Sequence, residues 1–249
     1  MTWALDLDGV VWRGDELLPG ADGAVRRLRE AGQRVVFLTN NSSPPLAATV
    51  AKLAGFGIPV DEDDILTSAQ AAASMLRTGS RALVCAGPGV VEALEAVGIE
   101  IAVAGPADAV VVGWHREFDY VGLTLAMSTV RAGARLVATN DDATYPMAEG
   151  LVPGGGALVA AVAYASGVAA EVAGKPHEPM VSLVRRRVGP VEVMVGDRAD
   201  TDGRLARRLG AQFGLVLSGV TAEADLPVDP APDMMAADLA TLVAARLPA

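Results

Sequence analysis

Short apolar runs alternate with amphipathic segments along most of the chain. Five of these runs are apolar almost throughout and rich in β-branched residues: 3–7, 34–39, 65–68, 191–196 and 213–219. The lack of polar alternation within them is typical of parallel strands that are covered on both faces. We therefore predict an α/β fold, a doubly wound parallel sheet with helices on either side.

Helical patterns follow several of these runs, and each ends at a glycine, as helices often do. The segments 21–32 and 201–210 have the spacing of helices packed on a sheet. In the segment 43–55, Ser43 is expected to cap the helix and Pro44 to lie in its first turn.

The middle of the chain repeats the α/β pattern on a smaller scale. Apolar runs alternate there with helical segments, and an Ala-rich stretch at 156–170 predicts a buried helix. Strand-like runs with polar motifs lie on both sides of this region, so it is expected to be an insertion. We predict a catalytic core of residues 1–78 and 171–249, with residues 79–170 as an inserted smaller α/β cap domain.

Composition narrows the classes of partner and compartment. The 249 residues carry a formal net charge of -10, which disfavours binding to nucleic acid or to an anionic membrane surface. Cys85 is the single cysteine, so no intramolecular disulfide is expected and a reducing, cytoplasmic location is predicted. The N-terminal segment has no basic region before its first apolar run, and we expect no signal peptide.

Polar clusters stand where the predicted strands end, which is where open α/β sheets bind ligands. The sequence DLDGV places Asp6 and Asp8 two residues apart, and TNNS spans 39–42 before a helix, whose N-terminus favours an anion. GKP contains Lys175, and GDRADTD contains Asp197 and Asp202.

Each cluster alone also fits a turn, a capping loop or a surface charge. Together they supply what phosphoryl transfer needs. A carboxylate can act as a nucleophile and form an aspartyl-phosphate. A phosphate will not approach several carboxylates without a counter-charge, and Mg²⁺ suits carboxylate and phosphate oxygens. A lysine adds a compact positive charge. Magnesium is therefore the predicted cofactor.

The four motifs DLDGV, LTNNS, GKP and VGDRADTD, in this order, resemble the signature of the haloacid dehalogenase superfamily. The insertion between the second and third motifs resembles the subfamily with a large α/β cap, which includes nucleotide, p-nitrophenyl phosphate, phosphoglycolate, glycerol-phosphate and pyridoxal-phosphate phosphatases. The resemblance covers essentially the whole chain. It implies a Mg²⁺-dependent hydrolase of small phosphorylated metabolites, with a Rossmann-like core.

The resemblance also implies a role for each motif residue. Asp6 would be the nucleophile and a magnesium ligand. Asp8 would be the general acid and then the base, with its backbone carbonyl on the metal. The remaining roles are metal binding by Asp197, support of a metal-bound water or of the lysine by Asp202, charge neutralisation by Lys175, and phosphate binding by Thr39, Asn40 and Asn41. Gly203 departs from the pattern, where an apolar residue is more usual.

Other activities share parts of this pattern. A phosphorylation-controlled receiver module also uses Asp, Mg²⁺, Thr or Ser and Lys, but it is shorter and places its phosphorylated Asp on a later strand. A dehalogenase needs no second Asp in the first motif, so Asp8 disfavours it. A degenerate phosphate-binding protein would have lost catalytic positions, and none is lost here. His115 and His177 are not needed for the phosphatase mechanism.

The substrate depends on the cap, which supplies contacts to the leaving group in this subfamily. The loop at 140–147 is the best specificity candidate, through Asp142, Thr144 and Tyr145. Trp114 and Arg116 are the second choice. The two aspartates of this loop, Asp141 and Asp142, would disfavour an extra anionic group and suit a polyol or a cationic group. Relatives with such caps often pair through them, so a homodimer is predicted.

Overall fold

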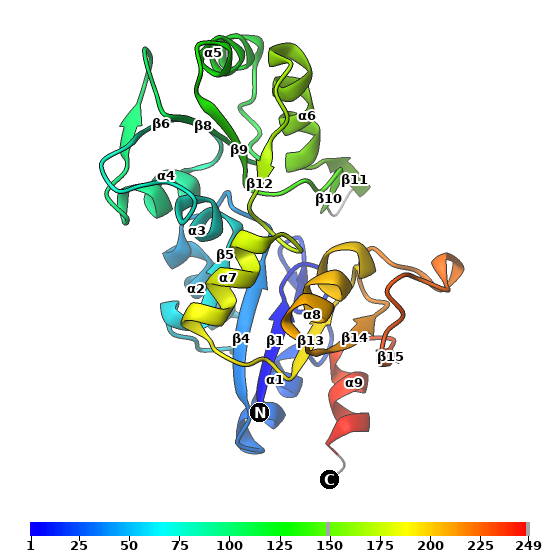
Figure 1. Ribbon diagram of the computed structural model, residues 1–249. Coiled ribbons are helices and arrows are strands. Elements are labelled where there is room, and N and C mark those ends of the chain that lie inside the picture. The colour runs from blue at the N-terminus through cyan, green and yellow to red at the C-terminus, as the bar shows by residue number, and fades with distance from the viewer. Residues whose placement is uncertain (148–149, 248–249) are drawn as a thin grey trace.

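The larger of two parallel sheets forms the base of the molecule in the computed structural model, which describes residues 1–147 and 150–247 (Figure 1). Within these residues its six strands run in the order β15-β14-β13-β1-β4-β5, and every neighbouring pair is parallel. Their bounds are β1 Thr2–Asp6, β4 Arg34–Thr39, β5 Ile65–Thr67, β13 Val193–Gly196, β14 Gln212–Val216 and β15 Met234–Ala236. The five predicted strands are all present, and the predicted doubly wound fold is confirmed.

Helices cover both faces of this sheet, because alternate strand residues point to opposite sides. Leu5, Val35 and Phe37 pack with α1 (Ala21–Glu30), α2 (Leu46–Gly55) and α9 (Leu239–Arg246). Ala4 and Val36 face the other side, toward α3 (Ser68–Ala73), α7 (Glu178–Arg187) and α8 (Arg204–Leu209). We call this sheet with its helices the core layer.

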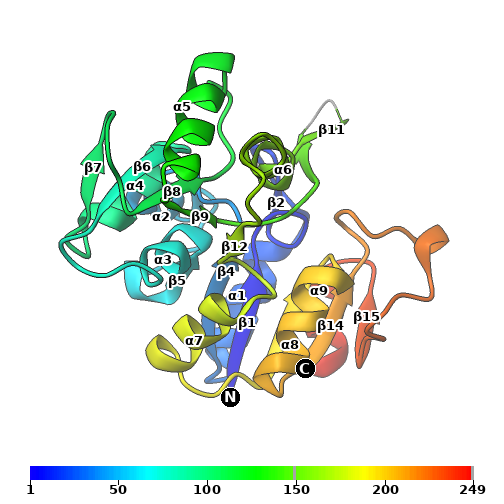
Figure 2. The same ribbon diagram turned by 45° about the horizontal axis from the view of Figure 1, so that its top comes forward.

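A second parallel sheet lies above the carboxyl ends of the first (Figures 1 and 2). Its described strands run in the order β12-β9-β8-β6-β7, with bounds β6 Arg81–Cys85, β7 Glu100–Ala102, β8 Ala109–Val112, β9 Arg135–Ala138 and β12 Glu171–Val172. Helices α5 (Tyr120–Arg131) and α6 (Gly155–Ser166) pack on one face, and α4 (Pro88–Glu95) on the other. We call the segment 81–172 the cap layer.

Strand β12 lies at the edge of the second sheet, next to the predicted border of the insertion. Glu171 and Val172 pair with Val137 and Ala138 of β9. Such a two-residue edge strand carries too little apolar pattern to be recognised in the sequence.

One apolar cluster is shared by the two layers. The face of the second sheet opposite α5 and α6 contributes Ala109, Val111 and Val137, which belong to the same buried cluster as Leu38 and Met194 of the first sheet. Helices α3 and α4 pack against each other across the junction. The layers are therefore joined by a continuous core on this side.

Two antiparallel hairpins lie near the other side of the junction. Strands β10 (Thr144–Met147) and β11 (Gly150–Pro153) extend from the cap layer, and β2 (Trp12–Arg13) pairs with β3 (Glu16–Leu17) in the core layer. Short helical turns cover Glu62–Asp64 and Glu223–Asp225, and a wide turn of π type covers Ala199–Gly203.

Three details of the predicted helices were wrong. Helix α2 begins at Leu46 after Pro45, and Ser43 does not cap it. Helix α8 begins at Arg204, because the wide turn occupies the start of the predicted segment. The Ala-rich helix α6 is only partly buried, and its Tyr164 is 93% exposed.

None of the described helices is long and apolar enough to cross a membrane.

Gly203 departs from the usual pattern for a packing reason. A Cβ atom at this position would lie 2.9 Å from the Phe213 ring and 3.0 Å from Pro230. The glycine lets the wide turn lie directly on β14.

Candidate active site

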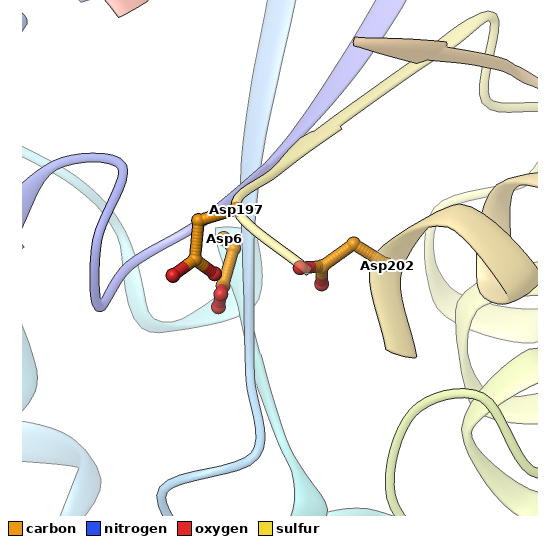
Figure 3. Close-up of side chains that lie close together, drawn as sticks. All are labelled: Asp6, Asp197 and Asp202. Atoms are coloured by element: carbon orange, nitrogen blue, oxygen red, sulfur yellow. The ribbon is translucent and has the colours of Figure 1, made fainter. Parts of the chain in front are cut away.

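Three aspartates converge at the carboxyl ends of neighbouring strands β1 and β13 (Figure 3). Asp6 is the last residue of β1, Asp197 directly follows β13, and Asp202 lies in the wide turn. Each offers a carboxylate oxygen within 4.8 Å of the other two, and all three side chains are buried. The sheet therefore brings together residues that lie almost 200 positions apart in the chain.

Two glycines make room for Asp197. A Cβ on Gly219 would lie 1.9 Å from Asp197 Oδ2, and one on Gly9 would lie 2.4 Å from it. Gly9 also has a φ of +81°, which favours glycine. The backbone N–H of Val220 donates to the same oxygen at 2.6 Å, which fixes the carboxylate.

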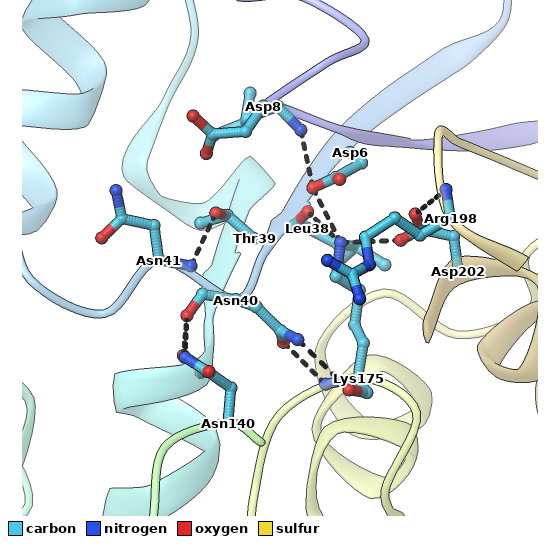
Figure 4. Close-up of polar contacts among 12 residues, drawn as sticks. Asp6, Asp8, Leu38, Thr39, Asn40, Asn41, Asn140, Lys175, Arg198 and Asp202 are labelled. Carbon is cyan, nitrogen blue, oxygen red and sulfur yellow. Dashed lines mark hydrogen bonds and ion pairs between the residues drawn. The ribbon is translucent and has the colours of Figure 1, made fainter. Parts of the chain in front are cut away.

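Lys175 is the buried cation of the site (Figure 4). Its Nζ lies 2.7 Å from Asp6 Oδ1, 2.7 Å from Asp202 Oδ1 and 3.3 Å from the carbonyl oxygen of Leu38. The second oxygen of Asp202 accepts from the N–H of Arg198. Asp202 thus holds Lys175 against Asp6, which is one of the two roles foreseen for it.

The buried carboxylates of the site carry more negative charge than Lys175 can balance. Burial raises the pKa of Asp6, and Lys175 opposes that shift. Burial also raises the pKa of Asp197, together with the charges of Asp6 and Asp202. Burial disfavours the charged form of Lys175, but Asp202 and Asp6 outweigh it and raise the pKa of the ammonium. One lysine faces three carboxylates, so a further cation is favoured here.

Thr39 and Asn40 lie beside this cluster at the end of β4. The hydroxyl of Thr39 accepts from the N–H of Asn41 at 3.0 Å and keeps its own proton to donate. The Asn40 side chain accepts from the N–H of Lys175 at 2.8 Å and donates to Asp142 at 3.0 Å. Asn40 therefore ties the lysine loop to the cap layer.

Asn41, which was expected to bind phosphate, hydrogen-bonds to other protein groups. Its Oδ1 accepts from the N–H of Ser43, and its Nδ2 donates to the Tyr145 hydroxyl at 3.1 Å. Both ends of this side chain are engaged, although it lines the same cavity as the aspartates.

Asp8 stands apart from the three clustered aspartates. Its Oδ1 accepts from Trp12 Nε1 and from the Tyr145 hydroxyl, both at 3.0 Å. Burial raises the pKa of Asp8, and these two hydrogen bonds oppose the shift. An aspartate with a raised pKa fits the protonated form that a general acid requires.

The cap layer closes the cavity above these residues. Of the five specificity candidates, Asp142, Thr144, Tyr145 and Trp114 line a cavity of about 50 Å³ together with the core residues. The Trp114 and Tyr145 rings lie 4.9 Å apart. Arg116 is exposed and does not line the cavity.

The histidines and the cysteine lie outside this cavity. His115 packs on Phe118 at 5.7 Å, and His177 Nε2 contacts Asp141 at 2.9 Å. Cys85 is buried under α5, where burial raises its pKa to about 11. None of the three is placed to take part in chemistry at Asp6.

Sequence comparison assigns the family. The family model for haloacid dehalogenase-like hydrolases matches residues 3–100, and an HAD-hydrolase-like model matches residues 172–242. Human glycerol-3-phosphate phosphatase is 35% identical over an alignment 260 positions long. The alignment covers 90% of this chain and 81% of that protein. This chain belongs to the haloacid dehalogenase-like hydrolases.

Solved structures agree with this assignment. A glycerol phosphate phosphatase from Mycobacterium tuberculosis in complex with magnesium has a TM-score of 0.88 and 34% identity, covering 97% of this hydrolase and 75% of that chain. A p-nitrophenyl phosphatase from Archaeoglobus fulgidus has a TM-score of 0.90 and 29% identity, covering 98% of each chain. The predicted activity class is confirmed: this hydrolase acts on phosphate monoesters, and its cofactor is magnesium.

The residues of this hydrolase fit such an ion. Buried carboxylate oxygens from Asp6, Asp197 and Asp202 form a hard-oxygen donor set, as Mg²⁺ prefers. Asp202 already accepts hydrogen bonds from Lys175 and Arg198. Asp6 and Asp197 are therefore better placed to bind the magnesium ion.

Sequence reasoning missed three residues of the hydrolase site. Trp12 donates to Asp8, Asn140 donates to the carbonyl of Asn40 at 2.8 Å, and Arg198 lines the cavity and pairs with Asp200 at 3.1 Å. Arg198 had a signal, because it directly follows Asp197. Asn140 lies in the loop at 140–147 that the sequence singled out, but its contact, like that of Trp12, depends on which loops the fold brings together.

Proposed function

We propose that this hydrolase removes the phosphoryl group from small polyol phosphates through an aspartyl-phosphate at Asp6. Both hydrogen-bonding contacts of the Asp6 carboxylate, from Leu7 N–H and Lys175, are made by Oδ1. Oδ2 of Asp6 is therefore the oxygen that attacks phosphorus. As the new O–P bond forms, the bond from phosphorus to the leaving oxygen breaks.

Asp8 moves the proton in both halves of the reaction. It gives its proton to the leaving oxygen, so that a neutral alcohol departs. It then takes a proton from the water that attacks the aspartyl-phosphate, which frees Asp6 and releases inorganic phosphate. Its raised pKa and its separation from the aspartate cluster support this division of roles.

The phosphoryl oxygens are held by groups of the core layer. Lys175 supplies a fixed positive charge beside Asp6, and the Thr39 hydroxyl has a proton to donate. Asn40 supports them by fixing the Lys175 backbone. Asp6, Asp197 and the backbone carbonyl of Asp8 would hold a magnesium ion, and its positive charge would let a phosphate dianion approach the carboxylates.

One oxygen in the cap layer favours a polyol as the leaving group. Asp142 Oδ2 accepts from Asn40, but Oδ1 is buried and has no hydrogen-bond partner among the described residues. A buried acceptor without a partner is costly, and a hydroxyl of the substrate would satisfy it. The same carboxylate disfavours a second anionic group.

The size of the cavity and the relatives support this choice. The cavity is small, about 50 Å³, and both layers line it, which suits a small phosphate ester. Proteins named glycerol-3-phosphate phosphatase and glycerol phosphate phosphatase are among the relatives. We therefore favour glycerol phosphate or a sugar-like phosphate of similar length.

A substrate panel with matched variants tests the proposal. Asp142→Ala should lower kcat/KM for glycerol 3-phosphate by about 10-fold or more, as loss of a hydrogen bond to a charged group does. p-Nitrophenyl phosphate, which has no hydroxyl to offer, should lose much less. Asp141→Ala, the neighbouring exposed aspartate, is the control. Equal losses on both substrates would place specificity elsewhere, with Trp114 the next residue to vary.

We also propose a domain division, an oligomeric state and a location for this hydrolase. We divide the hydrolase into a core of 1–78 and 173–249 and a cap domain of 79–172, supported by the two sheets. A homodimer through the cap is supported by the exposed apolar side chains of Tyr120, Val121 and Tyr164 on α5 and α6. A cytoplasmic location rests on the single cysteine.

A further inference from the structure

The contacts of Asp8 cross from one layer to the other. Trp12, in the core hairpin β2–β3, and Tyr145, on the cap hairpin β10–β11, each place a hydrogen-bonding group 3.0 Å from the same oxygen, Asp8 Oδ1. A catalytic carboxyl without a ligand has no general need for two protein partners on one oxygen. The second partner, Tyr145, therefore needs an explanation of its own.

The direction of each hydrogen bond follows from the groups involved. The indole N–H of Trp12 can only donate. The Tyr145 hydroxyl can donate or accept, and Asn41 decides between them. Asn41 Oδ1 accepts from the N–H of Ser43 at 3.1 Å, so its amide nitrogen is the end that faces Tyr145 and donates at 3.1 Å. The single phenolic proton is then directed to Asp8.

This polarity determines which oxygen of Asp8 carries a proton. Oδ1 receives two donors, so a proton placed on it would face two others. The proton of the acid form is therefore carried by Oδ2. Burial raises the pKa of Tyr145, which keeps the phenol protonated as the donor.

Both donors are held firmly by their surroundings. The Tyr145 ring lies against Trp114, whose Nε1 donates to the carbonyl of Pro153 in β11. The Trp12 ring lies 6.1 Å from Phe56 and 4.5 Å from the ammonium of Lys52. A small displacement of the cap hairpin would break the bonds of Tyr145 to Asp8 and Asn41, while the bond from Trp12 would remain.

We propose that Tyr145 is a positioning residue for the general acid, which orients the proton-carrying oxygen of Asp8 only when the cap layer is seated on the core. This inference rests on the proposed role of Asp8 and adds to it. The Tyr145 hydroxyl donates to Asp8 only when the cap layer is closed over the core. Protonation of the leaving group is therefore most efficient in the closed site. Tyr145 is thereby given a task that is separate from substrate recognition.

Tyr145→Phe is the decisive variant, because it removes the hydroxyl and keeps the ring that packs on Trp114. Tyr164→Phe, an exposed tyrosine on α6, is the matched control. The probes are phenyl phosphate and p-nitrophenyl phosphate, which are alike in shape but differ in their need for protonation of the leaving oxygen. The rate of the first release of phenol or nitrophenol is measured in a single turnover.

We expect Tyr145→Phe to slow release of phenol by about 10-fold or more and to leave release of p-nitrophenol within about 2-fold, with KM little changed for either. A loss of equal size on both substrates, or no loss on phenyl phosphate, overturns the inference. A purely structural role predicts the equal loss.

Asp8→Asn measured in parallel separates this inference from the proposed function. If Asp8→Asn keeps the phenyl phosphate rate, the role of Asp8 itself is wrong. If Asp8→Asn loses that rate but Tyr145→Phe keeps it, Asp8 is the general acid and only the part assigned to Tyr145 fails.

Discussion

Replacing Asp197 by asparagine should stabilise the metal-free protein while removing its response to magnesium. The carboxylate of Asp197 lies within 4.8 Å of those of Asp6 and Asp202, and all three are buried. Lys175 contacts Asp6 and Asp202 and makes no ion pair with Asp197. The charge of Lys175 therefore relieves only part of the repulsion between Asp197 and the other two carboxylates.

The magnitude follows from the separation. At 4.8 Å and an effective dielectric constant of about 20, each like-charged pair costs about 3 kcal/mol. Protonation relieves part of this cost in the wild type, because the pKa of Asp197 is raised. We expect a net gain of about 1–3 kcal/mol, which corresponds to a rise in Tm of about 2–12 °C for a chain of this length. The side-chain oxygen of the introduced asparagine can still accept from the N–H of Val220.

Thermal unfolding at pH 7.5 tests this in two conditions. In chelator, Asp197→Asn should melt above the wild type; in millimolar Mg²⁺, the wild type should gain stability and the variant should gain little. Asp61→Asn, an exposed aspartate far from the site, controls for the change in net charge. A variant that melts below the wild type in chelator, or gains as much from Mg²⁺, would refute the electrostatic argument.

Three other predictions concern the nucleophile, the metal site and the surface. Asp6→Asn should abolish turnover and the covalent phosphate that mass spectrometry detects after acid quenching; a persisting adduct would move the nucleophile elsewhere. Gly219→Ala places a Cβ 1.9 Å from an Asp197 oxygen, so its apparent Mg²⁺ affinity, titrated through activity, should fall by about 10-fold or more. Asp233 has a pKa lowered by the N–H of Phe213 and by Arg207. A lowered pKa means that the stabilisation is present above about pH 4 and is lost as pH falls below it, so Asp233→Asn should cost up to about 1 kcal/mol at pH 7 and nothing at pH 2 in urea unfolding. A constant difference between the two proteins across this range would contradict that reasoning.

The sheet could be predicted from the sequence because its central strands are apolar on both faces. Strand β4 was placed at its observed bounds, 34–39, for this reason. The three-residue edge strand β15 and the short Ala-rich helix α3 have too little pattern to be recognised. Strand β10 contains Pro146, which argues against a strand in sequence although an edge hairpin tolerates it.

The candidate site was predictable where a residue's role depends on its own strand end. Asp6 and Asp197 lie together at the ends of β1 and β13, because parallel strands end at one edge of the sheet. The contacts of Asn40 and Asn41 were not foreseen. Their partners Asp142 and Tyr145 lie more than 100 residues away, and only the folded cap brings them near.

The apolar cluster shared by the two layers has a consequence for unfolding. Ala109, Val111 and Val137 of the cap layer belong to the same buried cluster as residues of α3 and α7 of the core layer, so neither layer keeps its full hydrophobic interior without the other. The insertion should therefore not melt as an independent unit, and calorimetry should give one cooperative transition. For the same reason, transplanting this cap onto a related core would require matching the residues beneath it, and a graft chosen only by its loop ends would leave cavities at the junction.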